Sequence, residues 1–337
     1  MFKRILVPLD GSARAERALA VASRLAQASG GSLILLQVVG HDHDLWISGL
    51  PPRTQVDTPF APELMQAERY LAQVTISPAL KTIPTETVVL GGSPAQVILS
   101  VASSYQADVI VLCSHGYTGM TRWVMGSVAE KVARHALLPV LVLREGGPMP
   151  AGPYPDASHP LRVLVPLDGS AYAKAALLPA ASLIAALAAP AHGAMHLLRV
   201  VPPPSEDKTD NRHAVALQKA RGYLQQTVEH LREGWVASPA HLLNLTLTWS
   251  VAVQTDVADA IVRVAENGED AEGAGVFGSC DVIALASHGR SGLQRWAMGN
   301  VAERVLAATP LPLLIVRLPE MIDGNPVSRT QKVTIMP

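Results

Sequence analysis

Short apolar runs alternate along this chain with longer stretches in which apolar residues recur at helical spacing. The runs are rich in valine, isoleucine and leucine, which is typical of strands buried on both faces of a parallel sheet. In the first part of the chain this pattern predicts strands at residues 4–8, 32–39, 86–90, 108–113 and 139–143. It predicts helices at residues 13–29, 62–81, 94–105 and 127–136, with a loop over residues 40–61.

The whole pattern occurs twice. Residues 4–13, RILVPLDGSA, return as RVLVPLDGSA at residues 162–171, and VIVLCSHG at residues 109–116 returns as VIALASHG at residues 282–289. The copies lie 158 residues apart at Asp10 and Asp168 but 173 apart at Gly126 and Gly299, so the second copy carries insertions. We expect the largest insertion, within residues 268–277, to form a surface loop.

The repeat predicts the domain organisation. We expect a first domain at residues 1–145, a linker rich in proline and glycine at 146–160, a second domain at 161–318 and a tail at 319–337. Alternating strands and helices predict an open parallel sheet with helices on both faces in each domain. Ligands of such sheets bind beyond the carboxyl ends of the strands, where the strand order reverses. If the first and fourth strands are neighbours there, the loops after residues 9 and 113 face one crevice.

Composition narrows the function. The formal net charge is -1 and the isoelectric point about 6.8, which argues against a dedicated nucleic-acid or anionic-membrane binder. The longest uncharged stretch, residues 175–198, contains Pro179, Pro190 and Gly193, and is interpreted as a buried helix, a turn and a strand rather than a membrane span. The two cysteines belong to no disulfide or metal motif, so we expect a cytoplasmic protein.

Polar residues follow the predicted strands. Asp10 and Asp168 either accept a hydrogen bond from a sugar or a base, or bind a metal held with phosphates, or cap the next helix. Ser127 and Asn300 likewise either cap their helices or contact phosphate, and the glycine before each favours the second interpretation.

Other candidates are weaker. His115 and His288 have no second ligand at metal spacing, which argues against a metal site at these histidines. Residues 41–44, HDHD, have no counterpart in the second copy, so we interpret them as a solvated loop. Cys113 is expected to be a small buried residue, and Arg122 and Arg295 to be solvated or to reach phosphate oxygens. The sequence contains no GxxxxGK[ST] motif and no legible catalytic triad. It therefore predicts a binding site with little catalytic apparatus.

With these residues, the chain resembles the universal stress protein family in its tandem form, over about residues 1–145 and 160–318. ATP-binding members carry Gly-x2-Gly-x9-Gly followed by Ser, Thr or Asn. The matching positions are Cys113, Gly116, Gly126 and Ser127, and then Ala286, Gly289, Gly299 and Asn300. Small residues thus replace the first glycine in both copies. The family's Gly-x-Pro after the third strand survives at residues 92–94 but reads TDV at residues 255–257, which makes the first site the firmer prediction.

The resemblance implies a five-stranded sheet of order 3-2-1-4-5 in each domain, paired through the fifth strands as an intramolecular pseudo-dimer, with a further homodimer left open. It implies ATP as the ligand, with any Mg²⁺ held mainly by the phosphates. The expected nucleotide contacts in the first copy are Pro8, Leu9, Asp10, Val38, Cys113, His115, Gly116, Arg122, Gly126, Ser127 and Val128. Those in the second copy are Pro166, Leu167, Asp168, Val200, Ala286, His288, Gly289, Arg295, Gly299, Asn300 and Val301.

Three functions compete. The favoured one is an ATP-binding regulator of a stress response with little or no hydrolysis. The replaced glycines keep open a scaffold that binds no nucleotide. A phosphohydrolase or nucleotidyl transferase ranks last, because a shared fold supplies neither a base nor a nucleophile.

Overall fold

The computed structural model describes residues 2–40, 61–114, 125–144, 146–150, 160–189, 191–204, 211–236, 245–272, 275–287, 298–317, 321–322 and 325–326. The first half of the chain, up to residue 144, contains β1 (Arg4–Leu9), α1 (Ala13–Ser29), β2 (Ser32–Val39), α2 (Ala61–Thr75), β3 (Thr85–Gly91), α3 (Pro94–Ser104), β4 (Val109–Cys113), α4 (Ser127–His135) and β5 (Val140–Leu143).

The second half, residues 160–317, contains β6 (Leu161–Pro166), α5 (Ala171–Lys174), α6 (Leu177–Ala188), β7 (Gly193–Val201), α7 (Arg212–Val236), β8 (Leu245–Val253), α8 (Val257–Asn267), β9 (Glu269–Ala271), β10 (Gly275–Phe277), β11 (Val282–Ala286), α9 (Asn300–Ala308) and β12 (Leu313–Val316). Two short strands follow, β13 (Met321–Ile322) and β14 (Asn325–Pro326), which pair with each other.

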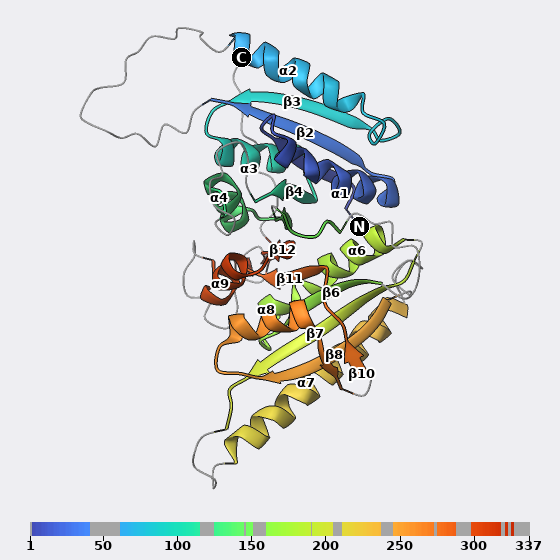
Figure 1. The fold of residues 1–337 in the computed structure, drawn as a ribbon, viewed down its shortest axis with the longest axis vertical. Helices are drawn as coiled ribbons and strands as arrows, with labels where there is room; N and C mark the ends of the chain where they lie inside the picture. Colours follow the sequence, from blue (N-terminus) through green and yellow to red (C-terminus); the bar gives the residue numbers. More distant parts are fainter. Residues whose placement is uncertain are drawn as a thin grey trace, which may run out of the picture.

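One ten-stranded sheet runs through the molecule in the order β3-β2-β1-β4-β5-β12-β11-β6-β7-β8 (Figure 1). Within each half the strands are parallel and follow the order 3-2-1-4-5. Helices α1, α2, α6 and α7 pack on one face, and α3, α4, α8 and α9 on the other. The predicted fold class is therefore confirmed.

The two halves join where β5 pairs with β12 in the antiparallel direction. The register places Leu141 opposite Leu314, and every residue of both strands is buried. An apolar strand left at the edge of a sheet is a template for aggregation. Pairing covers both such edges at once, and it makes the strands of the two halves run in opposite directions.

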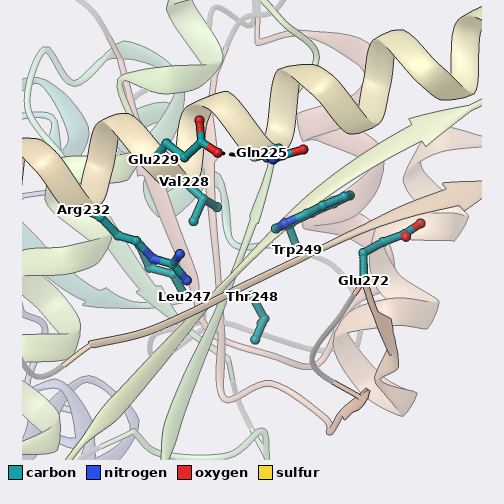
Figure 2. A pocket seen from close by; sticks show the side chains of 8 residues that line it. All are labelled: Gln225, Val228, Glu229, Arg232, Leu247, Thr248, Trp249 and Glu272. Carbon is teal, nitrogen blue, oxygen red and sulfur yellow. Dashed lines mark hydrogen bonds between the residues drawn. The ribbon is translucent and has the colours of Figure 1, made fainter.

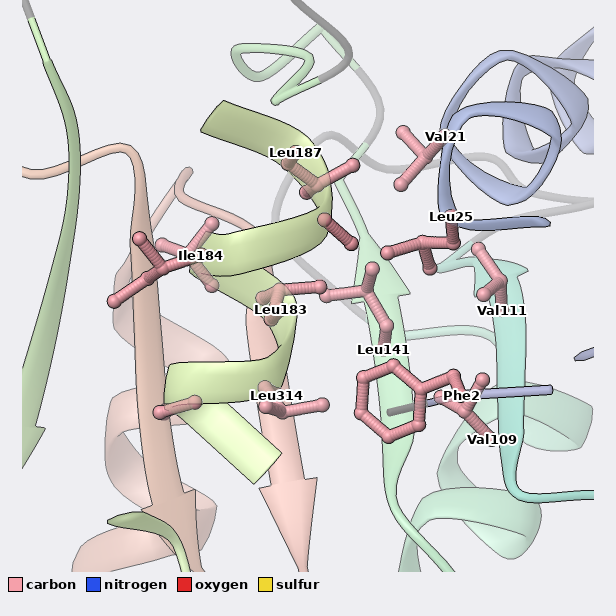
Figure 3. Close-up of a cluster of buried hydrophobic side chains, with 14 of the residues drawn as sticks. Phe2, Val21, Leu25, Val109, Val111, Leu141, Leu183, Ile184, Leu187 and Leu314 are labelled. Carbon is pink, nitrogen blue, oxygen red and sulfur yellow. The ribbon is translucent and has the colours of Figure 1, made fainter. Parts of the chain in front are cut away.

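The core beside this joint is shared by both halves. Val21 and Leu25 of α1 pack in the same cluster as Leu183 and Leu187 of α6, and all four side chains are 0% exposed. Figure 3 shows Leu25 and Leu183 on either side of Leu141. Since α1 and α6 come from different halves, one continuous core supports both.

Arginines link the halves at the ends of two helices. Arg144, directly after β5, donates from Nε to the carbonyl oxygen of Thr309 at 3.1 Å, at the end of α9. Arg317, directly after β12, donates from Nη1 to the carbonyl oxygen of Arg134 at 2.9 Å, near the end of α4. Arg134 also forms an ion pair with Glu303 of α9. Cations are favourable there because the last carbonyls of a helix lack intrahelical partners and carry partial negative charge.

Prolines end one helix earlier than predicted and divide another helix in two. The helix predicted over residues 62–81 ends at Thr75, and residues 76–82 form turns. Pro78 has no amide hydrogen and disfavours helical backbone in the residue before it. The helix that starts at Ala171 breaks after Lys174, because Pro179 leaves the carbonyl of Ala175 without its helical donor.

Residues 175–198 contain the whole of α6, followed by a turn and part of β7, as predicted. The segment Ala171–Ala188 is long and apolar enough to cross a membrane by length and composition, but 61% of it is buried inside the protein. It packs against α1, β6 and β7. Its apolar character is thus accounted for by the core it fills.

The insertion at residues 268–277 is not the irregular loop that we expected. Its residues form an antiparallel hairpin, β9 and β10, with Ala271 paired to Gly275. The amide of Glu272 donates to the carbonyl of Trp249 at 2.9 Å, on the edge strand β8. Phe277 is buried and stacks on His196 with ring centroids 4.2 Å apart. The hairpin therefore covers part of a sheet edge.

His196 is a buried histidine at the centre of β7, with no exposed surface. Its Nδ1 lies 2.8 Å from Thr248 Oγ1 and its Nε2 lies 2.8 Å from Ser250 Oγ. The two hydroxyls satisfy the neutral ring, since each can donate or accept a hydrogen bond. Burial lowers the pKa of His196 to about 4.

Substitution of the joint should destabilise the whole chain. We expect Leu141→Ala to lower the free energy of unfolding by about 2–5 kcal/mol, because it opens a cavity in the shared core. The control Leu137→Ala, at a side chain that is 67% exposed, should change it by less than about 0.5 kcal/mol. Urea unfolding followed by circular dichroism measures both, and equal effects of the two variants would contradict the shared core.

Acid should weaken the fold through His196. Between about pH 6.5 and pH 4 the unfolded chain binds a proton on this imidazole and the folded chain does not, so stability falls as the pH falls. The slope is at most about 1.4 kcal/mol per pH unit. Urea unfolding at a series of pH values should show a shallower slope for His196→Gln. An identical slope in both proteins would show that this side chain does not titrate as described.

Candidate functional site

Two clefts lie at the carboxyl ends of the strands, one in each half. The first has a volume of about 250 Å³ and is lined by Pro8, Leu9, Asp10, Ala15, Val38, Pro94, Ile98, Leu112, Cys113, Ser114, Gly126, Ser127, Val128 and Ala129. The second has a volume of about 360 Å³ and is lined by Pro166, Leu167, Asp168, Ala173, Leu198, Arg199, Val200, Val257, Ile261, Leu285, Ala286, Ser287, Gly299, Asn300, Val301, Ala302 and Val305. Small-molecule sites usually span about 300–1,000 Å³.

The start of α4 is tied to the end of β4. The amide of Gly126 donates to the carbonyl of Ser114 at 2.7 Å, and the amide of Gly299 donates to Ser287 in the same way, also at 2.7 Å. Each strand end and helix start therefore face the cleft as one unit, in both copies. The neighbouring first strand, β1 or β6, supplies the opposite wall.

Ser127 and Asn300 are not helix caps, contrary to one of the two interpretations above. Gly126 and Gly299 are the N-cap residues, and neither helix start has a side-chain cap hydrogen bond. Ser127 and Asn300 are the first helical residues, and both are exposed. A glycine cap has no side-chain oxygen, so the first amides of the helix remain available to a ligand with negative charge.

Asp10 and Asp168 are not caps either. Ser12 caps α1, since its Oγ accepts from the amide of Ala15 at 3.1 Å, and Ser170 caps α5 in the same way. Asp10 Oδ1 instead accepts from the Ser12 hydroxyl at 2.6 Å and from its amide at 3.0 Å. Between them, Gly11 has a φ of 83°, a left-handed conformation that glycine adopts without strain. The carboxylate is thereby held at the cleft.

The structure brings sixteen of the predicted contacts together, eight at each cleft. They are Pro8, Leu9, Asp10, Val38, Cys113, Gly126, Ser127 and Val128, and then Pro166, Leu167, Asp168, Val200, Ala286, Gly299, Asn300 and Val301. His115, Gly116, Arg122, His288, Gly289 and Arg295 lie outside the described residues, as do residues 41–44. Whether any of these residues contacts a ligand stays a prediction.

The replaced motif residues leave the clefts open. Cys113 and Ala286 line the clefts without filling them. Pro94 begins α3 at the first cleft, and Val257 begins α8 at the second, where Asp256 caps the helix through bonds to the amides of Ala258 and Asp259. The lost Gly-x-Pro therefore did not remove the helix that borders the second cleft.

Sequence reasoning missed the apolar wall of each cleft and one cation. Ile98 and Ile261 follow the helix starts at Pro94 and Val257 by four residues, so helical spacing was the signal that could have found them. Arg199 directly precedes the predicted Val200 on β7 and also lines the second cleft. Local sequence spacing does not show that the Arg199 side chain lines the cleft, because this depends on the tertiary structure at the end of β7.

A third hollow lies away from the glycine turns. It has a volume of about 440 Å³ and lies between α7, the edge strand β8 and Glu272 (Figure 2). Glu229 accepts from Gln225 at 3.2 Å, and Glu272 pairs with Arg221 at 2.9 Å. No helix start and none of the predicted contacts lines it, so it is a poorer site for phosphate than the two smaller clefts. Within the described residues, no group of three or more His, Cys, Asp or Glu side chains could hold a metal ion.

These features agree with a comparison against protein families. A sequence model described as the universal stress protein family matches residues 1–144 and 161–317. The chain belongs to this family. Because the match falls in two segments, the chain carries two tandem universal stress protein domains.

Individual relatives support the same conclusion. A universal stress protein of Thermus aquaticus, from a QAH/OAS sulfhydrylase 3' region, is 35% identical over 150 residues, which are 43% of this chain and 100% of that protein. Universal stress protein YxiE of Bacillus subtilis is 31% identical over 149 residues, again 43% of this chain and 100% of the relative. A crystal structure of a universal stress protein from Archaeoglobus fulgidus shares the fold, with a TM-score of 0.59 and 19% identity over 93% of this chain and 98% of that chain.

The two thiols should differ in reactivity. Cys113 is half-buried at the first cleft, whereas Cys280 is 5% exposed and its burial raises the pKa of the thiol. Because the thiolate is the reactive form, we expect a disulfide reagent such as DTNB to modify Cys113 in the native protein and Cys280 only after unfolding. The control Cys113→Ser should show no fast phase. Equal rates at both thiols would contradict this assignment.

Proposed function

We propose that this universal stress protein binds ATP in its two clefts and acts as a regulator in a stress response, with little or no hydrolysis. The observation that carries the proposal is the repeated helix start. In both copies, a helix with a glycine N-cap and no side-chain cap bond begins at the cleft between the first and fourth strands. Such a helix end offers backbone amides and the positive end of the helix dipole to phosphate.

The remaining lining suits the rest of a nucleotide. Val38 and Val200 stand at the ends of β2 and β7, where an apolar wall would contact the base. Asp10 and Asp168 present a carboxylate at the end of the first strand, where a ribose hydroxyl would donate to it. The phosphates would then lie at Gly126 and Ser127, or at Gly299 and Asn300. This arrangement also follows the motif that the family's ATP-binding members carry.

Hydrolysis is proposed to be weak. The described lining residues include one carboxylate per cleft and no histidine, so they offer little general acid–base chemistry. Mg²⁺ would be held mainly by the phosphates. The competing proposal, a scaffold that binds no nucleotide, is favoured by the replacement of the first motif glycine at Cys113 and Ala286.

Three further expectations remain proposals. We place the domains at residues 1–145 and 161–318, with a linker at 146–160 and a tail at 319–337. We regard the joined halves as a pseudo-dimer, which leaves β3 and β8 at the outer edges of the sheet for any further homodimer. We also propose that the protein acts in the cytoplasm.

Carboxylates placed at the two helix starts should abolish ATP binding without unfolding the protein. In Ser127→Glu with Asn300→Glu, each new carboxylate occupies the expected phosphate position, yet an acid in the first turn stabilises a helix by about 0.3–1 kcal/mol. Calorimetric titration with ATP should show binding to the native protein and at least a roughly hundredfold loss in the double variant.

The matched control replaces the same residues with alanine, which removes the side chains but keeps the backbone amides. We expect that variant to retain affinity within about tenfold, since the amides carry most of the binding. The melting temperature checks that all three proteins are folded. Unchanged affinity in the glutamate variant would contradict the assigned clefts, and no ATP binding by the native protein would favour the scaffold.

A further inference from the structure

The two halves differ in charge near the clefts at two positions related by the repeat. Glu16 of α1 corresponds to Lys174 of α5, with the same 158-residue offset as Asp10 and Asp168. Gln37 of β2 corresponds to Arg199 of β7, directly before the equivalent residues Val38 and Val200. An acid and a neutral amide in the first half thus become two cations in the second.

The charge beside an equivalent tyrosine is negative in the first half and positive in the second. In the first half, the hydroxyl of Tyr70 donates to Glu16 Oε1 at 3.0 Å. In the second half, Lys174 Nζ lies 5.0 Å and Arg199 Cζ lies 5.4 Å from the ring centroid of Tyr223. Both cations therefore gather at one aromatic ring, which favours them through its negative face.

Two cations of the first half are replaced by neutral residues in the second. Arg17 of α1 corresponds to Ala175, and it donates to the carbonyl oxygens of Arg144 and Gly147. Arg14, in the first turn of α1, corresponds to Tyr172. With Asp10, Arg14, Glu16 and Arg17, the first half has a formal charge of 0 at these positions. With Asp168, Lys174 and Arg199, the second half has a formal charge of +1.

Arg199 reaches the cleft itself. It lines the second cleft, and its Nη1 lies 2.7 Å from where a Cβ atom would stand on Gly169, in the turn after β6. In the first half, Gln37 Nε2 lies 3.9 Å from the same position on Gly11. The Oε1 of Gln37 is buried and has no hydrogen-bond partner within the described part of the chain. Gln37 does not line the first cleft, so Arg199 gives the second cleft a cation that the first cleft lacks.

This cation is separate from the helix start that we propose for the phosphate chain. The α9 helix begins beside β11, whereas Arg199 belongs to β7, and β6 lies between these strands. Two strand spacings amount to about 10 Å. A nucleotide with phosphate at α9 would therefore reach Arg199 with its sugar.

We propose that the second cleft binds an adenine nucleotide with an additional phosphate on its ribose, and that Arg199, assisted by Lys174, selects this ligand. The proposal rests on nucleotide binding as proposed above and names the ligand class of one cleft. The first cleft takes a ribose with free hydroxyls, which can donate to Asp10. In nucleotide-binding folds an acid generally accepts from ribose hydroxyls, whereas a nearby arginine accommodates a phosphate on the ribose.

The glutamate variants allow each cleft to be tested by itself, because each variant blocks the other cleft. Ser127→Glu leaves the second cleft open, and Asn300→Glu leaves the first open. Each protein is titrated calorimetrically with ADP and with adenosine 3',5'-bisphosphate and its 2',5' isomer, which carry the same number of phosphates in different places. We expect the open second cleft to prefer one of the bisphosphates over ADP by at least about tenfold, and the open first cleft to show no such preference.

Exchange of the side chains provides the matched control. Lys174→Glu with Arg199→Gln, added to Ser127→Glu, should remove the preference, and Glu16→Lys with Gln37→Arg, added to Asn300→Glu, should create it. Equal preference in the two clefts, with ADP binding intact, would overturn this inference alone. Absence of all nucleotide binding by the native chain would overturn the proposed function as well. Melting temperatures confirm that each variant is folded.

Discussion

The antiparallel pairing of β5 with β12 is the constraint on which the rest of the structure depends. These two strands are four residues long and wholly buried, and each would otherwise be the exposed apolar edge of a parallel sheet. Their pairing fixes the position of one half against the other. It also brings α1 against α6 and lets Arg144 and Arg317 each hold a helix end in the opposite half.

Backbone hydrogen bonds connect this pair of strands to both candidate sites. The amide of Ser114 donates to the carbonyl of Leu143, the last residue of β5, at 2.7 Å, and the carbonyl of Ser114 accepts from Gly126. In the second half, Ser287 connects Val316 and Gly299 in the same way. The start of each cleft helix is therefore anchored to a strand of the joint. Because these contacts are made by backbone atoms, they persist although the surrounding side chains differ between the copies.

Duplication thus preserved a backbone and allowed its side chains to diverge. The first-strand turns are the same in both halves, with a glycine at a φ of 83° or 88° and a serine cap held by an aspartate. Around them, the side chains of the second half became more positively charged, and a hairpin was added at the β8 edge. The backbone amides at the two helix starts are unaffected by such changes, since substitution of a side chain leaves the amides in place.

The sequence alone determined the elements, the duplication and most of the site. Strand runs, glycine turns and helix starts are local signals, so the existence of the strands and eight of the residues that line each cleft could be predicted from spacing and from the family resemblance. Only the tertiary structure decided the rest. The N-cap residue of α4 is Gly126 and not Ser127, and the amide of Gly126 donates to the carbonyl of Ser114 at the end of β4. Arg199 lines the second cleft and residues 268–277 form a hairpin that contacts β8. Neither feature could be predicted from a local pattern, because each depends on a neighbour distant in sequence.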